Sequence, residues 1–263
     1  MLSWATDVHL DFLEDDERRA FARSVAATGC EGLLLTGDIS DHRALARHLV
    51  ELADAIDAPV WFVLGNHDYY HGSVASGREA VRALARRFTR LVWLHDADVL
   101  TLRPDVALVG VDGWGDARLG APDTTPILLN DFRLIEELAW LSIDARNAAL
   151  RAFGDESARV LERKLATALE GHARVIVATH VPPFREACWH EGALSGDEWL
   201  PFFTCHAVGE VLLRAADAQP SRRIEVYCGH THSPGIAHLR DNLVVHTGGA
   251  EYGRPAVAGR IVI

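Results

Sequence analysis

The sequence predicts an α/β fold, because short apolar runs typical of buried strands alternate with segments of helical periodicity. The chain begins as strand, helix, strand, helix and strand, from residues 3–8 to the run PVWFVL that ends at Leu64. Parallel strands joined by helical crossovers produce this alternation. A helix-rich middle follows, and the chain ends with several short apolar runs separated by turn residues.

The first half of the chain can be assigned element by element. A helix is expected over residues 15–27, where Phe21 and Val25 share one face and Gly29 ends the helix. The elements expected after it are a buried strand over residues 33–35, a helix through Leu45, Leu49 and Leu52, the strand PVWFVL, a helix from about Arg78 to Arg90, and the short strands LVWL and VALVGVDGW.

The middle of the chain, from Asn130 to Gly171, has an almost wholly helical pattern. Apolar residues recur in steps of four and three from Leu134 to Ala152, and a second helix is expected through Leu161, Leu165 and Ala168. Five final segments predict strands: RVIVATH, IEVYCGHTH, IAHL, NLVVHTGG and AVAGRIVI. Because no repeat, low-complexity tract or linker is present, we expect one domain over residues 1–263. Residues 112–171 would form a loop and helical elaboration on it.

Composition indicates a globular protein for which we expect no membrane partner and do not favour a nucleic-acid partner. A chain of 263 residues, 49% of them hydrophobic, can bury a substantial core. No apolar run approaches the roughly 18 residues of a membrane span, and the start MLSWATDVHLDF does not resemble a secretion signal. We therefore expect a cytoplasmic protein. The formal net charge of -11 disfavours attraction to nucleic acid, and the sequence predicts no particular oligomeric state.

The cysteines are not expected to carry chemistry. Their spacing shows no pairing, so we expect reduced core residues rather than disulfides or a zinc ribbon at Cys30, Cys188, Cys205 and Cys228. Acidic residues offer another route to function, because carboxylates gathered in one place can hold divalent cations.

Polar side chains follow five of the predicted strands at the point where each strand ends. They are Asp7 and His9 in DVH, Asp38 in GD, Asn66, His67 and Asp68 in GNHD, His180 in TH, and His230 and His232 in GHTH. Taken singly, GD and GNHD are ordinary turn sequences and TH could cap a helix. The pair in DVH is weak evidence for a metal, and the two histidines of GHTH are a moderately strong chelating pair. Ligands of open α/β sheets collect at the carboxyl ends of strands, however. The five groups together therefore predict a single site.

The order DVH, GD, GNHD, TH and GHTH resembles the calcineurin-like metallophosphoesterase superfamily, and the match extends from Asp7 to His232. The resemblance implies two facing mixed β-sheets flanked by helices, an αββα sandwich, with two divalent metal ions at the strand ends. It assigns one ion to Asp7, His9, Asp38 and His232. It assigns the other to Asp38, Asn66, His180 and His230, so that Asp38 would bridge the two ions.

The predicted ligands suit the chemistry that the resemblance implies. Oxygen and imidazole ligands without thiolate favour Mn, Fe or Zn. Two such ions, roughly 3.5 to 4 Å apart, can clamp a phosphoryl group and activate a bridging hydroxide as the nucleophile. By the same resemblance, His67 would protonate the leaving oxygen or stabilise charge on the phosphate. Asp68 would fix the tautomer of His67.

The substrate is less well defined by the sequence. In the loop from Asp112 to Gly120, Trp114 could stack on a base and Arg118 could clamp a phosphate, although a packed surface loop explains both equally well. The favoured function is a binuclear-metal-dependent phosphoesterase acting on a phosphomonoester or phosphodiester of a small molecule. A nuclease of the same chemistry and a non-catalytic scaffold on this fold remain as alternatives.

Overall fold

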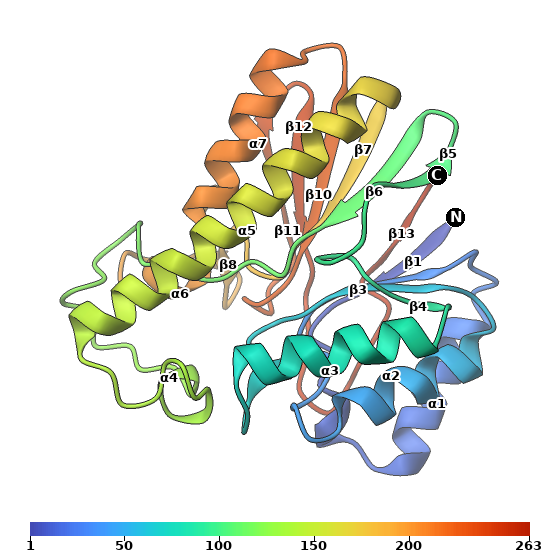
Figure 1. Cartoon of the computed structure of the whole chain (residues 1–263), viewed down its shortest axis with the longest axis horizontal. Helices are drawn as coiled ribbons and strands as arrows, with labels where there is room; N and C mark the ends of the chain where they lie inside the picture. Colours follow the sequence, from blue (N-terminus) through green and yellow to red (C-terminus); the bar gives the residue numbers. More distant parts are fainter.

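The computed structural model describes every residue from Met1 to Ile263 and contains two mixed β-sheets that face each other (Figure 1). The first sheet has the strand order β13-β1-β2-β3-β4. Strands β1 to β4 are parallel, and β13 runs antiparallel to β1. The bounds of these strands are Leu2–Ala5 for β1, Leu33–Thr36 for β2, Val60–Val63 for β3, Leu91–Trp93 for β4 and Gly259–Ile261 for β13.

The second sheet has the order β11-β12-β10-β7-β6-β5, with four parallel central strands and an antiparallel strand at each edge. In its centre, Val226 lies opposite Val177 on one side and Val245 on the other. The bounds are Leu100–Arg103 for β5, Val106–Gly110 for β6, Arg174–Ala178 for β7, Arg223–Cys228 for β10, Gly235–Arg240 for β11 and Leu243–Thr247 for β12. A separate hairpin is formed by β8 (Trp189–His190) and β9 (Ala193–Leu194).

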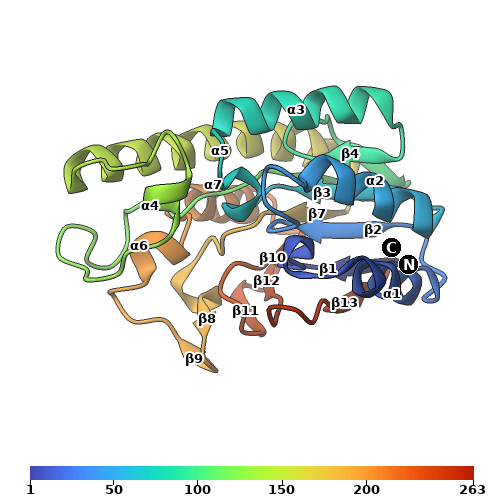
Figure 2. The ribbon, with the colours of Figure 1, turned by 90° about the horizontal axis from the view of Figure 1, so that it is seen from below.

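Helices cover the outer face of each sheet, which gives the αββα arrangement that the sequence predicted (Figures 1 and 2). Helices α1 (Asp15–Ala26), α2 (Leu45–Ile56) and α3 (Val74–Arg87) lie on the first sheet, and α5 (Ile143–Gly171) and α7 (His206–Ala218) lie on the second. Successive side chains of a strand point to opposite faces of the sheet and so pack in different cores. Leu33 and Leu35 pack with the helices, whereas Leu34 packs between the sheets. No helix combines the length and the apolar character that a membrane crossing requires.

The topology places the five polar motifs at one end of the molecule. They follow β1, β2 and β3 in the first sheet and β7 and β10 in the second, all of which are parallel strands within their sheets. The short helices α4 (Asp131–Leu134) and α6 (Leu200–Phe203) lie at the end of the molecule opposite the two termini in both views.

The predicted pair of long helices between Asn130 and Gly171 is wrong in its first half. The chain forms only the single turn α4, leaves the helix at Ile135, and then forms one continuous helix of 29 residues. The interruption has a cause in tertiary contacts, because Ile135 forms a β-bridge with Gly72, beside the GNHD segment. Ser142 then caps α5 by accepting a hydrogen bond from the amide of Ala145.

Helix α3 begins earlier than the sequence predicted, at Val74 instead of Arg78. The reason is local, since Ser73 and Ser76 form a reciprocal capping box at its first turn. All four cysteines are free, and three are buried while Cys30 is partly exposed. The expectation of unpaired core cysteines is therefore confirmed for three of them.

Candidate metal centre

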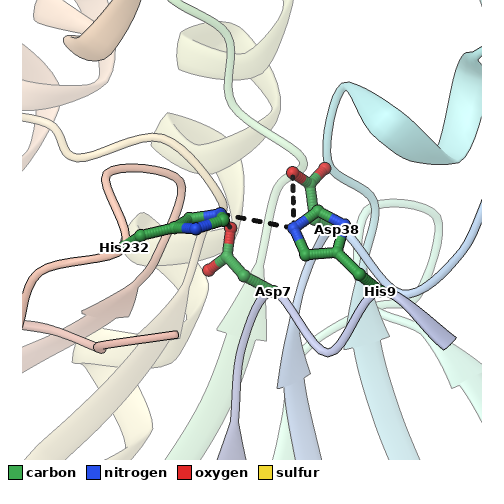
Figure 3. A group of neighbouring side chains, drawn as sticks. All are labelled: Asp7, His9, Asp38 and His232. Carbon is green, nitrogen blue, oxygen red and sulfur yellow. Dashed lines mark hydrogen bonds and ion pairs between the residues drawn. The ribbon is translucent and has the colours of Figure 1, made fainter. Parts of the chain in front are cut away.

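Two groups of aspartate and histidine side chains converge where the strands end. Within each group the ligand atoms lie within 4.8 Å of one another. The first group is Asp7, His9, Asp38 and His232, shown in Figure 3, and the second is Asp38, His180 and His230. Asp38 belongs to both, which is the arrangement that the resemblance implied for a bridging carboxylate. The two sheets contribute to each group, so the centre lies across the interface between them.

The backbone at this site is strained to an unusual degree. Left-handed φ angles between 39° and 70° occur at five of the converging residues, namely Asp7, His9, Asp38, His230 and His232. Such angles are unfavourable for residues other than glycine and cluster at functional sites, where the surrounding structure holds them. Short turns that leave each strand with this geometry point the side chains inward, toward a common centre.

In the first group, ligand atoms face one another with no hydrogen donor assigned between them. The Nε2 atoms of His9 and His232 are 3.3 Å apart, and the Nε2 of His232 lies 3.4 Å from an Asp7 oxygen (Figure 3). The Nε2 of His9 lies 3.9 Å from Oδ2 of Asp38. Nitrogen and oxygen atoms converging in this way fit a cation placed between them.

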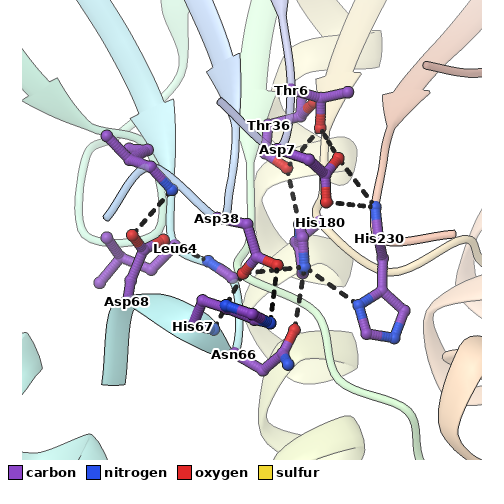
Figure 4. A network of polar contacts seen from close by, with 12 residues as sticks. Thr6, Asp7, Thr36, Asp38, Leu64, Asn66, His67, Asp68, His180 and His230 are labelled. Carbon is purple, nitrogen blue, oxygen red and sulfur yellow. Dashed lines mark hydrogen bonds and ion pairs between the residues drawn. The ribbon is translucent and has the colours of Figure 1, made fainter. Parts of the chain in front are cut away.

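The second group repeats the pattern around His180 (Figure 4). Its Nε2 atom lies 3.3 Å from Oδ1 of Asp38, 3.2 Å from Nδ1 of His230 and 3.1 Å from the amide oxygen of Asn66. Asn66 is therefore placed beside this group, where the resemblance assigned it. The complete donor set is oxygen and imidazole nitrogen without a thiolate, which fits divalent ions such as Mn, Fe or Zn.

Backbone carbonyls orient two of the imidazoles. Nδ1 of His180 lies 2.9 Å from the carbonyl oxygen of Thr36, and Nε2 of His230 lies 3.1 Å from that of Phe202. Each contact assigns a proton to the outer nitrogen, because a carbonyl only accepts, and turns the inner nitrogen toward the cluster. Partners of this kind fix tautomer and ring orientation at metal sites.

The amide of Asn66 is oriented by two residues that the sequence analysis did not identify. Its Nδ2 donates to Asp131 at 2.8 Å and lies 3.2 Å from the hydroxyl of Tyr70, which in turn donates to Asp131 at 2.6 Å. This network turns the amide oxygen toward His180. No sequence signal pointed to Asp131, because it lies 65 positions beyond Asn66 in the helical elaboration.

The charges of the buried groups favour a cation. Burial alone would raise the pKa of Asp38, but the charges of His180 and His67 outweigh it and hold the pKa well below its ordinary value. Burial lowers the pKa of His9 to about 4, and burial with the nearby His180 lowers that of His230 to about 3. The imidazoles of His9 and His230 are therefore uncharged at neutral pH. Against the effect of burial, the carboxylates of Asp38 and Asp7 raise the pKa of His180 to about 10 and also raise the pKa of His232, so positive charge is favoured at the centre of the cluster.

His67 lies beside the cluster, at the side of Asp38. Its backbone amide donates to Oδ1 of Asp38 at 2.9 Å, and its Nε2 lies 3.9 Å from Oδ2 of the same residue. The ring stacks on Tyr70 with 4.2 Å between centroids. The side chain is 16% exposed, whereas those of His9 and His180 are fully buried, so His67 can reach a bound small molecule.

Asp68 does not contact the imidazole of His67, which corrects the prediction that it fixes the tautomer. Its oxygens instead accept hydrogen bonds of 2.8 to 2.9 Å from the backbone amides of Ile39, Ser40 and Gly65. Asp68 thus ties the turn after β3 to the turn after β2. It positions Asp38 and Asn66 through the backbone.

The predicted substrate contacts of Trp114 and Arg118 do not agree with their positions. Trp114 is 2% exposed and packs between Tyr69 and Phe153, so its ring has no free face for a base. Arg118 donates to Asp116 at 3.1 Å and to Asp155 at 2.7 Å. Trp114 supports the loop from inside and Arg118 supports it through ion pairs at the surface, as the alternative of a packed surface loop stated.

A cavity of about 320 Å³ opens beside the cluster. On one side it is lined by ligand candidates and His67, and on the other by residues 128–131, His190, Phe203 and Tyr252. The ring of Tyr252 lies 4.4 Å from that of His9 and 4.9 Å from that of His232. The sequence analysis missed Tyr252, because a lone tyrosine in a glycine-rich turn carries no chemical signature.

Comparisons with known proteins agree with this architecture. Residues 4–234 match the family described as Calcineurin-like phosphoesterase. The chain is similar to the solved structure of a phosphopantetheinyl hydrolase from Mycobacterium tuberculosis, with 14% identity, a TM-score of 0.66, and coverage of 94% of this chain and 89% of that one. It is also similar to a dimetal phosphatase from Danio rerio, at 15% identity and a TM-score of 0.56, covering 94% and 86%. At these identities the likeness shows the fold alone, and no curated protein matches the sequence.

Proposed function

Because the chain belongs to the calcineurin-like phosphoesterase family, we propose that it is a hydrolase that uses two divalent metal ions to cleave a phosphomonoester or phosphodiester of a small molecule. The observation that carries the proposal is the pair of aspartate and histidine groups that share Asp38 and border an open cavity. Dinuclear metal dependence is typical of the family. A cytoplasmic location remains a prediction from the sequence.

Seven residues would hold the metal ions. One ion would take Asp7, His9, Asp38 and His232, and the other Asp38, Asn66, His180 and His230. When bound, two such ions polarise a phosphoryl oxygen and lower the pKa of a shared water. The carbonyls behind His180 and His230, and the Asp131 carboxylate behind Asn66, keep the ligand atoms facing inward. We propose Mn, Fe or Zn as the metal.

His67 would supply a proton to the leaving oxygen. Three features support this role: a partly exposed ring on the cavity wall, a place next to Asp38, and a fixed orientation against Tyr70. A histidine is suited to general acid catalysis near neutral pH. Asp68 would act on the same step indirectly, because it holds the turn that carries His67.

The experiment compares Asp38→Asn with the wild type in metal content and in turnover. Protein stripped of metal and reloaded with Mn would be assayed on phenyl phosphate and on bis(4-nitrophenyl) phosphate. The wild type should bind two ions and hydrolyse at least one ester, whereas Asp38→Asn should lose affinity for both ions, because its side chain is shared.

Asp57→Asn is the matched control. Asp57 has the same left-handed backbone, with φ of 51° against 50° for Asp38, but its side chain is 99% exposed and remote from the cluster. It should behave as the wild type. An Asp38→Asn variant with two tightly held ions and full activity would rule out the bridging role. A wild type with two ions and no turnover of either ester would contradict the hydrolase itself.

A further inference from the structure

The wall of the cavity that faces the metal ligands carries no arginine or lysine. It is built from separate parts of the chain: Leu128 and Asn130 before α4, His190 in β8, Phe203 in α6, and Tyr252 after β12. Residues from all of these segments line the same cavity. The wall is therefore a composite surface where an organic group attached to the phosphate would lie.

Two arginines on these segments are each held by a neighbouring side chain. Arg133 in α4 donates to Oδ1 of Asn130 at 3.2 Å, and Arg254 pairs with Glu251 at 3.3 Å. Neither lines the cavity. The charged residue that does line the wall is Asp131, which is 4% exposed and accepts from Asn66 and Tyr70. The fixed charge of this wall is thus negative.

The positive charge expected at the cluster compensates the charge of only one phosphate group. Two divalent cations carry four positive charges, and the carboxylates of Asp7 and Asp38 offset two of them. The dianion of a single phosphate monoester, or the monoanion of a phosphodiester together with one hydroxide, would offset the other two. A second anionic group on the substrate would face the carboxylate of Asp131 on a wall without arginine or lysine, and an uncompensated charge in a partly buried cavity is unfavourable.

The wall is instead suited to apolar and aromatic groups. Leu128 is 78% exposed at the rim, although leucine is usually buried, and it has room to pack on a ligand. His190 and Phe203 form an edge-to-face pair with 5.3 Å between centroids, and Nδ1 of His190 lies 3.4 Å from the carbonyl of Thr231. Tyr252 covers the opposite side, against His9 and His232.

We propose that the substrate is an ester of one phosphate whose organic group is apolar or aromatic and carries no negative charge near the phosphorus. This inference rests on the proposed function, because it places the phosphate at the metal cluster. It distinguishes the cavity from sites for diphosphates, bisphosphates and phosphorylated acids, which require cationic side chains beyond the metal ions.

The test uses two pairs of compounds that differ in one charge. Binding of (4-methylbenzyl)phosphonate and (4-carboxybenzyl)phosphonate to the Mn-loaded protein would be measured by calorimetry, because phosphonates are not hydrolysed. Turnover of the corresponding benzyl phosphates would be measured in parallel. The substituent is remote from the phosphate and barely changes the pKa of the leaving alcohol. Assays at pH 8 keep an ordinary histidine neutral. The methyl compounds should bind about tenfold more tightly and have a correspondingly higher kcat/KM.

A variant that introduces a positive charge tests whether the organic group of the substrate lies against this wall. Leu128→Lys places a cation at the rim and should improve binding of the carboxylate compound about three- to tenfold, an effect that weakens with added salt. Leu141→Lys is the matched control, because Leu141 is 40% exposed in the same part of the chain but does not line the cavity. It should leave both affinities unchanged.

The two measurements separate the inference from the function on which it rests. Equal affinity for both phosphonates, tighter binding of the carboxylate, or equal effects of the two lysine variants would overturn the proposed substrate class. Preferential binding of the methyl phosphonate without turnover of either ester would support the proposed ligand class and overturn the proposed hydrolase activity.

Discussion

Replacement of His67 by alanine separates proton donation from metal binding. The imidazole lies beside Asp38 on the cavity wall but belongs to neither ligand group. The His67→Ala variant should therefore keep both metal ions. It loses the stacked contact with Tyr70, which at 4.2 Å between centroids corresponds to about 0.5–1.5 kcal/mol of folding stability. The fold should survive this loss.

The effect on rate should be far larger than the effect on stability. A general acid contributes typically about 10²- to 10⁴-fold, equivalent to about 3–5 kcal/mol of transition-state stabilisation. The loss should depend on the leaving group. A nitrophenolate leaves without a proton and should lose little, whereas an alkoxide needs one and should show the full loss.

The assay is kcat/KM over a series of aryl and alkyl phosphates, with metal content measured on the same samples. His238→Ala is the control, because His238 is exposed on β11, away from the cluster. An equal loss for every leaving group would refute proton donation and indicate stabilisation of the phosphate instead. Loss of a metal ion would mean that His67 is itself a ligand.

Three further changes test other parts of the structure. Arg118→Ala should leave kcat/KM unchanged on any hydrolysed ester. It should lower the free energy of unfolding, measured in urea, by about 1–3 kcal/mol, because the buried carboxylate of Asp116 loses its cation. A selective rise in KM would show that Arg118 does contact the substrate. Asp131→Ala should free the amide of Asn66 and weaken metal binding about 10- to 100-fold in competition with a chelator, whereas unchanged affinity would show that the amide needs no support. Burial lowers the pKa of His48 to about 4 in the folded protein, so between pH 6.5 and pH 4 the unfolded chain binds more protons than the folded chain. The stability that His48 contributes is therefore complete above pH 6.5 and is lost as the pH falls toward 4. His48→Gln should reduce this pH dependence by on the order of 1 kcal/mol between pH 7 and pH 5, and an unchanged slope would contradict it.

The strands and the metal-ligand candidates were predictable because their signals are local. A run such as Leu33 to Leu35 is apolar on both faces, as a strand buried between helices and a second sheet requires. The polar residues that interrupt the pattern at strand ends, from Asp7 to His232, lie together because topology brings parallel strands to one edge. The order of motifs supplied the assignment of ligands, which periodicity alone does not provide.

Features that depend on tertiary contacts were not predictable. The break after α4 follows from the bridge between Ile135 and Gly72, which are distant in sequence. Gly154 does not interrupt α5, and its missing side chain instead allows Asp116 to approach, since a Cβ there would lie 2.6 Å from that residue. The partners of Asp68 proved to be backbone amides, which have no sequence signature.

The position of the cluster between two sheets has a consequence for the kinetics of unfolding. A metal ion held by both Asp7 and His232 would close a loop of more than two hundred residues, which acts on the chain as a reversible cross-link. Because the two ends meet only after both sheets have packed, the cross-link forms late in folding. It would therefore slow unfolding while leaving the folding rate nearly unchanged. The half-life of the native protein, more than its rate of formation, would depend on the supply of metal.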